Sequence, residues 1–226
     1  MANVTILLGK SGTGKSTSLK GLDPKSTLVL NTLGKRLPFK GSNVSYNIEN
    51  KNLFRVNTYQ EVLNMLVNTN KSAPHIKTII LEDAIYIMRK EYFTRAGESG
   101  YKKYVELAQH FQQIVATCES MREDINVFLI LHSEDVVTDG TIAEFKVSTI
   151  GKLLDTTYNP IEVVPMVLYS DVLFDDKGKA SYGFYTNRIM KGGTIIPAKS
   201  PEGLFEEDFI PNDLSIVIKA MQEYYG

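Results

Sequence analysis

One stretch near the start of the chain combines the residue types that bind phosphate. It reads Gly9-Lys10-Ser11-Gly12-Thr13-Gly14-Lys15-Ser16, which fits the P-loop pattern G-x-x-x-x-G-K-[ST] at every position, and Thr17 follows directly. The glycines let the backbone curl so that successive N–H groups face the phosphates of a nucleotide. We expect Lys15 to reach the β- and γ-phosphates and the hydroxyl of Ser16 to be a Mg²⁺ ligand. All residues of this stretch, with Thr17, are candidate nucleotide-binding residues.

Two adjacent carboxylates follow an apolar run at residues 78–81. A P-loop needs an acid at the end of a neighbouring strand to hold the water shell of the metal, and Glu82 and Asp83 both stand there. If the strand ends at Leu81, Glu82 occupies the usual place of this acid, and Asp83 can act from the next residue. The alternative for Asp83 is that it caps the helix that follows. Both acids are candidate metal-binding and catalytic residues, because a nearby acid also orients the attacking water.

A histidine follows another apolar run, at residues 127–131. A parallel strand there delivers His132, and Ser133 after it, to the same edge of the sheet as the P-loop. A polar side chain at that place can sense the γ-phosphate, so His132 is a candidate catalytic residue. The alternative is a structural histidine at a strand end, the role expected for His75 and His110.

Arg188 is the only arginine after Arg122. It follows the last strand of a predicted hairpin, and in an oligomer it could reach the γ-phosphate of the neighbouring subunit as an arginine finger. The alternative is a solvated arginine at a strand end.

The predicted elements bring these side chains to one edge of a sheet. Short apolar runs rich in β-branched residues predict buried strands at residues 4–8, 26–30, 78–81 and 127–131. Helical patterns between the strands predict helices at residues 16–22, 59–67 and 101–121. Strands that alternate with helices indicate an α/β fold with a mostly parallel central sheet flanked by helices.

The remaining regions carry weaker patterns. Segments 163–174 and 180–186 flank a connection that contains Gly178, which predicts an antiparallel C-terminal hairpin. Residues 32–57 are expected to be irregular, with an edge strand near 44–48, and residues 133–160 to be polar and partly mobile. A terminal helix is predicted over 212–225, capped by Asn212 or Asp213.

Composition limits the class of protein. The chain of 226 residues has 43% hydrophobic and 23% charged residues, which is typical of a soluble globular protein. One cysteine and three histidines predict neither a disulfide framework nor structural zinc, and the short early apolar run predicts neither a signal peptide nor a membrane span. Residues 1–60 hold nine Lys/Arg and two Asp/Glu, a charge of +7, whereas the remainder carries 16 minus 24, or -8. We therefore expect a cytoplasmic protein with an anionic ligand near its N-terminus.

The polar stretch after residue 132 combines basic and aromatic side chains. Phe145, Lys146, Lys152 and Tyr158 are of the types with which proteins bind single-stranded nucleic acid. The alternative is an ordinary surface loop.

These motifs together resemble the RecA-like P-loop ATPases of bacteriophages, in particular the compact annealing ATPases. The resemblance rests on the P-loop, the strand that ends at Glu82-Asp83 and the strand that ends at His132. It rests further on Thr149-Ile150-Gly151-Lys152 and on two tail segments, Ala198-Lys199-Ser200-Pro201-Glu202-Gly203-Leu204-Phe205 and Ile210-Pro211-Asn212-Asp213-Leu214. The tail segments are more specific than the P-loop.

The resemblance implies a single RecA-like domain over residues 1–226, whose tail, 197–226, packs on the core. It implies an ATP-binding, Mg²⁺-dependent ATPase that forms a ring or filament and acts on single-stranded DNA in phage recombination or replication. It places the protein in the cytoplasm of the bacterial host.

Two other functions are compatible with a P-loop. A small-molecule or nucleotide kinase normally clamps the transferred phosphoryl group with several arginines, and the last hundred residues hold only Arg188. A partitioning-type switch ATPase has a signature lysine at the place of Lys10, but Ser11 stands where that motif has glycine.

Overall fold

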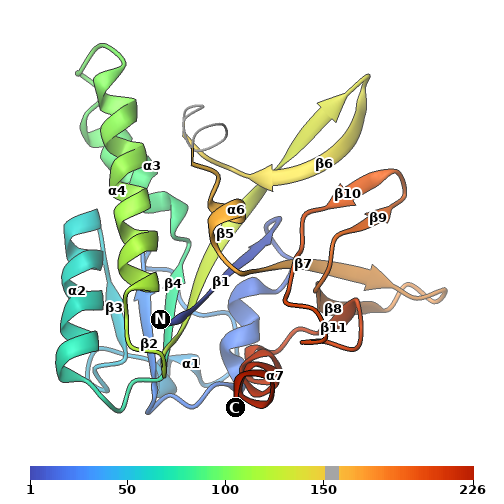
Figure 1. The fold of residues 1–226 in the computed structure, drawn as a ribbon, viewed down its shortest axis with the longest axis horizontal. Coiled ribbons are helices and arrows are strands. Elements are labelled where there is room, and N and C mark those ends of the chain that lie inside the picture. The colour runs from blue at the N-terminus through green and yellow to red at the C-terminus, as the bar shows by residue number, and fades with distance from the viewer. Residues whose placement is uncertain (151–157) are drawn as a thin grey trace.

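A mostly parallel sheet forms the centre of the computed structural model, which describes residues 1–150 and 158–226 (Figure 1). Its strand order is β11-β8-β7-β1-β5-β4-β2-β3. The segment from β7 to β3 is parallel, and β8 and β11 add to it antiparallel. The strands are β1 (Asn3–Gly9), β2 (Thr27–Asn31), β3 (Leu53–Arg55), β4 (Thr78–Glu82), β5 (Asn126–Thr138), β7 (Met166–Phe174), β8 (Ala180–Tyr185) and β11 (Phe209–Pro211). The predicted α/β fold with its C-terminal hairpin is confirmed.

Both faces of this sheet are buried, which explains why its strands are continuous apolar runs. Ile6 and Leu8 of β1 pack in one cluster with Phe111, whereas Leu7 between them packs in a second cluster with Leu19 and Val217. The first face is covered by α2 (Tyr59–Ser72), α3 (Ile85–Thr94) and α4 (Lys102–Glu119), and the second by the 3-10 helix η1 (Lys15–Gly21) and α7 (Leu214–Tyr225). Alternation along each strand thus supplies two separate cores.

The carboxyl-terminal half of β5 belongs to a second, smaller sheet. Beyond Leu131 this strand leaves the buried centre and pairs antiparallel with β6 (Thr141–Val147). β10 (Thr194–Ile196) joins β6 to β9 (Ile189–Lys191), as the upper right of Figure 1 shows. Within the stretch expected to be polar and partly mobile, residues 133–138 and 141–147 thus form paired strands. Backbone pairing among β5, β6 and β10 stabilises these strands. The mixture of polar and apolar side chains in the sequence does not indicate this pairing.

The region after β2 also differs from its prediction. The short helix α1 (Ser42–Ser45) occupies the place of the edge strand expected near 44–48, and the edge strand is β3 instead. Val44 and Ile48 are exposed, so their β-branched side chains are not buried in a sheet. The short helix α6 (Pro160–Val163) precedes β7.

The end of the chain packs on η1. Leu214, Val217 and Met221 of α7 are buried with Leu19 and Leu22. The predicted terminal helix is confirmed, and Asp213 is its cap, because its Oδ1 accepts a hydrogen bond from the backbone N–H of Ser215. In the part of the chain that the structure describes, no helix has the length and apolar character needed to cross a membrane.

Candidate nucleotide-binding site

The carboxyl ends of the parallel strands enclose a pocket. Gly9 at the end of β1 is the register partner of His132, and Asn31 at the end of β2 is the partner of Glu82, so the register alone brings these side chains to one edge. The pocket has a volume of about 660 Å³. It is lined by Ser11, Gly12, Gly14, Lys15, Ser16, Thr17, Asn31, Lys35, Arg36, Leu37, Pro38, Glu82, Asp83, His132, Tyr182 and Asn212.

The P-loop is packed so closely that two of its positions require glycine. A Cβ on Gly9 would lie 2.6 Å from the backbone oxygen of Ser170, and a Cβ on Gly14 would lie 2.6 Å from Nδ2 of Asn212. Gly14 also has a φ of 92°, in the left-handed region that favours glycine. The loop is thus held between β7 on one side and the segment before α7 on the other.

Lys15 is buried beneath the loop. Its Nζ donates hydrogen bonds to the backbone oxygens of Gly9, at 2.8 Å, and Lys10, at 2.6 Å. Burial lowers the pKa of this lysine to about 8, and the charges of Glu82 and Asp83 oppose that shift. These hydrogen bonds hold the amino group of Lys15 in one place with two acids nearby, which suits a phosphate contact.

Glu82 reaches the P-loop directly. Its Oε1 accepts a hydrogen bond from the hydroxyl of Ser16, and its Oε2 is buried without a partner among the described residues. Burial raises the pKa of Glu82 to about 7; the Ser16 hydrogen bond opposes this rise, while Asp83 adds to it. Of the two acids, Glu82 is the one in contact with the P-loop hydroxyl.

The donor set at this point fits Mg²⁺. This hard cation prefers oxygen ligands, and it is commonly held by one or two carboxylates together with substrate phosphates and water. The Ser16 hydroxyl and the Glu82 carboxyl group meet here, and the buried Oε2 of Glu82 has no hydrogen-bond donor among the described residues. A metal at this place would satisfy that oxygen.

Asp83 faces the histidine. Its Oδ1 lies 2.8 Å from Nε2 of His132, and Lys35 lies 3.7 Å from its other oxygen. Burial acts to raise the pKa of Asp83, but the hydrogen bond and charge of His132, with Lys35 and Lys15, hold it below its ordinary value. The alternative that Asp83 caps the next helix is wrong, because the cap position of α3 is Ala84 and no side chain caps it. Asp83 has a φ of 55°, a conformation uncommon for a residue with a side chain.

His132 lines the pocket as predicted, although it does not end a strand. β5 continues to Thr138, and the imidazole sits between Asp83 and the ring of Tyr86, which it meets edge-on at a centroid distance of 6.2 Å. His110 instead stacks on Tyr59 and bonds Glu91, in keeping with a structural role.

Some candidate residues lie outside the pocket lining. The side chain of Lys10 pairs with Asp135 of β5 and lies over the ring of Phe145, so it does not take the place of a signature lysine facing the phosphates. Thr13 turns its hydroxyl to the oxygen of Lys10. Arg188 is largely exposed, 3.7 Å from Glu144, and is not brought to the pocket of its own chain.

The stretch singled out for nucleic acid is engaged within the chain. Phe145 stacks on Tyr169, and Lys146 pairs with Glu134. Tyr158 packs against the first core, and Lys152, with Gly151, lies outside the described residues.

Sequence reasoning missed several lining residues. Asn31 ends β2, Lys35 and Arg36 follow it, and their position at or after the end of a predicted parallel strand was the available signal. Tyr182 and Asn212 carried no such signal, because they arrive from the antiparallel β8 and the segment before α7.

A comparison with known families adds to this geometry. The model of an AAA domain family matches residues 1–190, a range that contains the P-loop, both acids, His132 and Arg188. None of the curated proteins compared with the chain matches it significantly.

Proposed function

Because the chain belongs to the AAA domain family of P-loop ATPases, we propose that it is a Mg²⁺-dependent ATPase that acts as an oligomer on single-stranded DNA, in the manner of the compact RecA-like annealing ATPases of phages. The observation that carries the ATPase part is the contact of Ser16 with the buried Glu82 beside Lys15. The phage and recombination role rests on the resemblance of the P-loop and tail motifs.

Each side chain of the pocket has a separate role in this proposal. Lys15 binds the β- and γ-phosphates, and Ser16 and Glu82 hold Mg²⁺, which when bound neutralises phosphate charge. Asp83 is ionised because of its neighbours, so it can orient a water molecule and accept its proton. His132 bonds Asp83 and lies where it can contact a γ-phosphate.

The ATPase proposal is tested by comparing the parent protein with Lys15→Ala. Loss of a charge-assisted phosphate contact costs about 1.5 to 3 kcal/mol, so we expect ATP affinity to fall more than tenfold. Calorimetric titration with ATP and Mg²⁺ measures this, and phosphate release measures hydrolysis. Equal affinity in the two proteins would show that the pocket does not bind the triphosphate.

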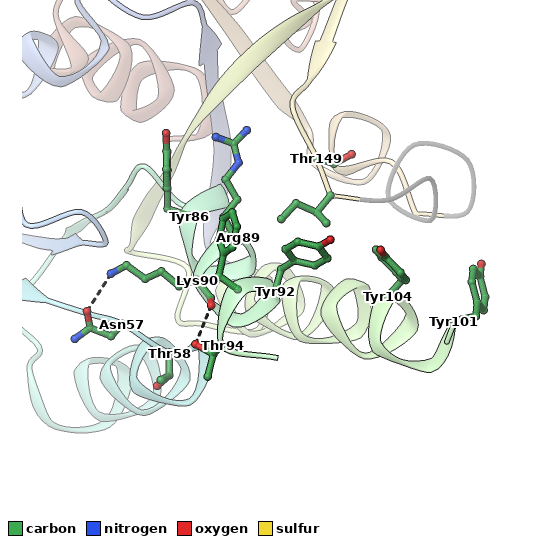
Figure 2. Close-up of a pocket in the computed structure, with 12 residues that line it drawn as sticks. Asn57, Thr58, Tyr86, Arg89, Lys90, Tyr92, Thr94, Tyr101, Tyr104 and Thr149 are labelled. Atoms are coloured by element: carbon green, nitrogen blue, oxygen red, sulfur yellow. Dashed lines mark hydrogen bonds between the residues drawn. The ribbon is translucent and has the colours of Figure 1, made fainter. Parts of the chain in front are cut away.

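An aromatic groove beside the pocket supports single-stranded DNA as the substrate. The groove has a volume of about 1360 Å³ and runs along α3 and α4 (Figure 2). It is lined by Asn57, Thr58, Tyr86, Arg89, Lys90, Tyr92, Phe93, Thr94, Tyr101, Tyr104, Thr149 and Ile150. No carboxylate occurs among these described lining residues, whereas five are aromatic and two are basic. Aromatic rings for stacking bases and cations for the backbone are the means by which proteins bind single strands.

The acidic side chains near the groove form ion pairs with basic side chains. Arg95 pairs with Glu91, Glu98 and Glu106, and Lys102 also pairs with Glu106, which offsets part of the negative charge that would repel a polyanion. Phe93 is 73% exposed and Tyr101 is 66% exposed. Exposed rings of this size at a groove without acids favour a ligand with flat faces and negative charge.

A contact between two side chains links the groove and the nucleotide pocket. Tyr86 lines the groove and contacts His132 of the pocket, and the guanidinium of Arg89 lies 4.8 Å from the centre of the Tyr86 ring. Arg89 also donates a hydrogen bond to Ser148, which precedes groove residue Thr149. A movement of His132 on nucleotide binding would thus be transmitted to the groove through its contact with Tyr86.

The DNA part is tested with a fluorescent oligonucleotide. We expect binding at low salt that weakens steeply as salt rises, since phosphate contacts release counterions, and we expect ATPase activity to rise with the oligonucleotide. A protein that hydrolyses ATP but binds no single strand at low salt would favour the kinase alternative, which is then tested with nucleoside and small-molecule acceptors.

The oligomer part rests on Arg188. Its exposure and its distance from its own pocket suit a residue that acts on the neighbouring subunit. We expect Arg188→Ala to bind ATP like the parent but to lose hydrolysis, and a mixture of Arg188→Ala with Lys15→Ala to recover part of the activity. Sedimentation with ATP and oligonucleotide reports assembly. A monomer in which Arg188→Ala remains fully active would contradict the shared site.

A further inference from the structure

The nucleotide pocket is lined by two groups of side chains of different chemistry. The first group is Lys15, Glu82, Asp83 and His132, where the γ-phosphate belongs in the proposed function. Lys35 belongs to this first group, because it is 3.7 Å from Asp83. The second group is Tyr182 and Asn212, which lie beside Gly14 of the P-loop.

Tyr182 contributes an aromatic ring to the pocket beside Gly14. It comes from β8, is 48% exposed, and its Cδ1 would lie 3.1 Å from a Cβ on Gly14. The ring is therefore at the margin of the P-loop, with nearly half of its surface uncovered. A flat apolar face at this distance from the phosphate-binding backbone suits a nucleobase.

Asn212 holds the P-loop at the same point. Its Nδ2 donates a hydrogen bond of 3.0 Å to the backbone oxygen of Gly14, and its backbone N–H donates to the oxygen of Tyr182. Its Oδ1 is buried and has no partner among the described residues. A buried acceptor without a donor is uncommon in proteins, and it points to a donor supplied from outside the chain.

The next residue fixes this arrangement from the other end of η1. A Cβ on Gly21 would lie 2.4 Å from Oδ1 of Asp213, so Asp213 packs on the last residue of η1. The same Asp213 caps α7. The pair Asn212-Asp213 thus ties both ends of η1 to α7, and it lies beyond residues 1–190, the range that the AAA domain model matches.

From these contacts we propose that Tyr182 and Asn212 form the nucleoside end of the site. The Tyr182 ring stacks on the base, and the Asn212 amide joins Gly14 of the P-loop to a donor of the nucleoside, either a ribose hydroxyl or an exocyclic amino group. This inference rests on the proposed binding of a nucleoside triphosphate at the P-loop. Tyr182 is a specificity-determining residue, and Asn212 is a positioning residue that makes nucleoside recognition depend on the segment before α7.

The test compares ATP with inorganic tripolyphosphate, which has the phosphates but no nucleoside. We expect Tyr182→Ala to weaken ATP binding about tenfold, the size of one lost stacking contact, and to leave tripolyphosphate binding within twofold. Tyr182→Phe keeps the ring and is expected to bind ATP like the parent. Tyr224→Ala, a matched exposed tyrosine on α7, is expected to change neither ligand.

Asn212→Ala has its own readout. We expect this substitution to weaken the binding of ATP more than the binding of tripolyphosphate. We also expect it to reduce the difference in affinity between ATP and an analogue that lacks the nucleoside donor bound by Asn212. That analogue is 2′-deoxy-ATP for a 2′-hydroxyl donor, 3′-deoxy-ATP for a 3′-hydroxyl donor and purine riboside triphosphate for an amino donor. Equal affinity of the parent for ATP and all three analogues would overturn the role of Asn212.

Different results would contradict the role of Tyr182 and the proposed nucleotide binding. If Tyr182→Ala binds ATP like the parent, or loses ATP and tripolyphosphate equally, the nucleoside end lies elsewhere and the inference is overturned while nucleotide binding stands. If the parent binds neither ligand, the proposed function fails and the inference with it. Lys15→Ala must weaken both ligands, because it removes a phosphate contact.

Discussion

The nucleotide pocket and the aromatic groove meet at Tyr86 and differ in what holds their side chains. In the pocket, charged groups are buried at the ends of central strands and bond one another, as Ser16 does with Glu82 and His132 with Asp83. In the groove, Phe93 near the end of α3 and Tyr101 directly before α4 are exposed. The pocket is fixed by sheet register, whereas the groove is fixed by the packing of α3 against α4.

This difference has consequences for ligand recognition. Buried charges at fixed places suit a small ligand with defined atoms, such as a triphosphate, because each charge must be matched. Exposed rings accept many bases and many backbone paths, because every base has a flat face. The two regions therefore suit one specific and one sequence-tolerant ligand, and the following substitutions separate them.

The largest effect is expected at Glu82. Glu82→Gln keeps the shape of the side chain but removes the charge that holds the metal, so the ATPase rate should fall by about 100-fold or more. ATP affinity should change much less, because Lys15 remains, and oligonucleotide binding without nucleotide should be unchanged. Phosphate release and calorimetry measure these quantities. Full activity in Glu82→Gln beside an inactive Asp83→Asn would transfer the metal role to Asp83.

The groove is tested by removing its two most exposed rings. Phe93→Ala with Tyr101→Ala should weaken single-stranded DNA binding by about 30-fold or more, since each lost stacking contact is worth about 1 to 3 kcal/mol. Basal ATPase activity should not change. Tyr224→Ala with Tyr225→Ala on α7 is the matched control, because these tyrosines are also exposed. Fluorescence anisotropy measures binding, and equal losses in both double variants would remove the groove as the DNA site.

His132 tests whether the two regions communicate. In His132→Ala, ATP and ADP should still bind, but the difference in DNA affinity between the ATP and ADP states should shrink by about tenfold, within the usual range of coupling energies. The reason is that His132 joins Asp83 in the pocket to Tyr86 in the groove. A variant that keeps the full difference between ATP and ADP would show that coupling uses another route.

The smallest effect is a pH dependence of stability in metal-free protein. Glu82 has a pKa of about 7 in the folded chain against an ordinary value of 4.5, so the folded state holds its proton more tightly than the unfolded state. Its contribution to stability is complete below pH 4.5 and is lost as pH rises through about 7. In Glu82→Gln the side chain does not titrate, so this variant does not lose that contribution as pH rises. From pH 5 to pH 8, the free energy of unfolding of the parent should therefore fall by about 2 kcal/mol more than that of Glu82→Gln. Urea unfolding at both pH values measures this, and a constant difference would contradict the buried, proton-binding Glu82.

Much of the fold and part of the site could be predicted from the sequence. Continuous apolar runs predicted β1, β2, β4 and the first half of β5, because strands buried on both faces leave no polar alternation. The P-loop spacing and the two acids at the end of the predicted strand indicated side chains that line one pocket, since local chain geometry delivers those side chains wherever the strands lie.

Tertiary structure alone decided the rest. The polar second half of β5 becomes a strand through pairing with β6, a contact that side-chain pattern does not encode. Glu82 rather than Asp83 contacts Ser16 because the chain turns at Asp83 with a positive φ and directs that carboxylate to His132. Tyr182 and Asn212 reach the P-loop from more than 160 residues away in the chain, and only the antiparallel pairing of β8 with β11 brings them there. Local spacing determined which residues can bind phosphate, and long-range packing determined which neighbours set their charge and complete the pocket.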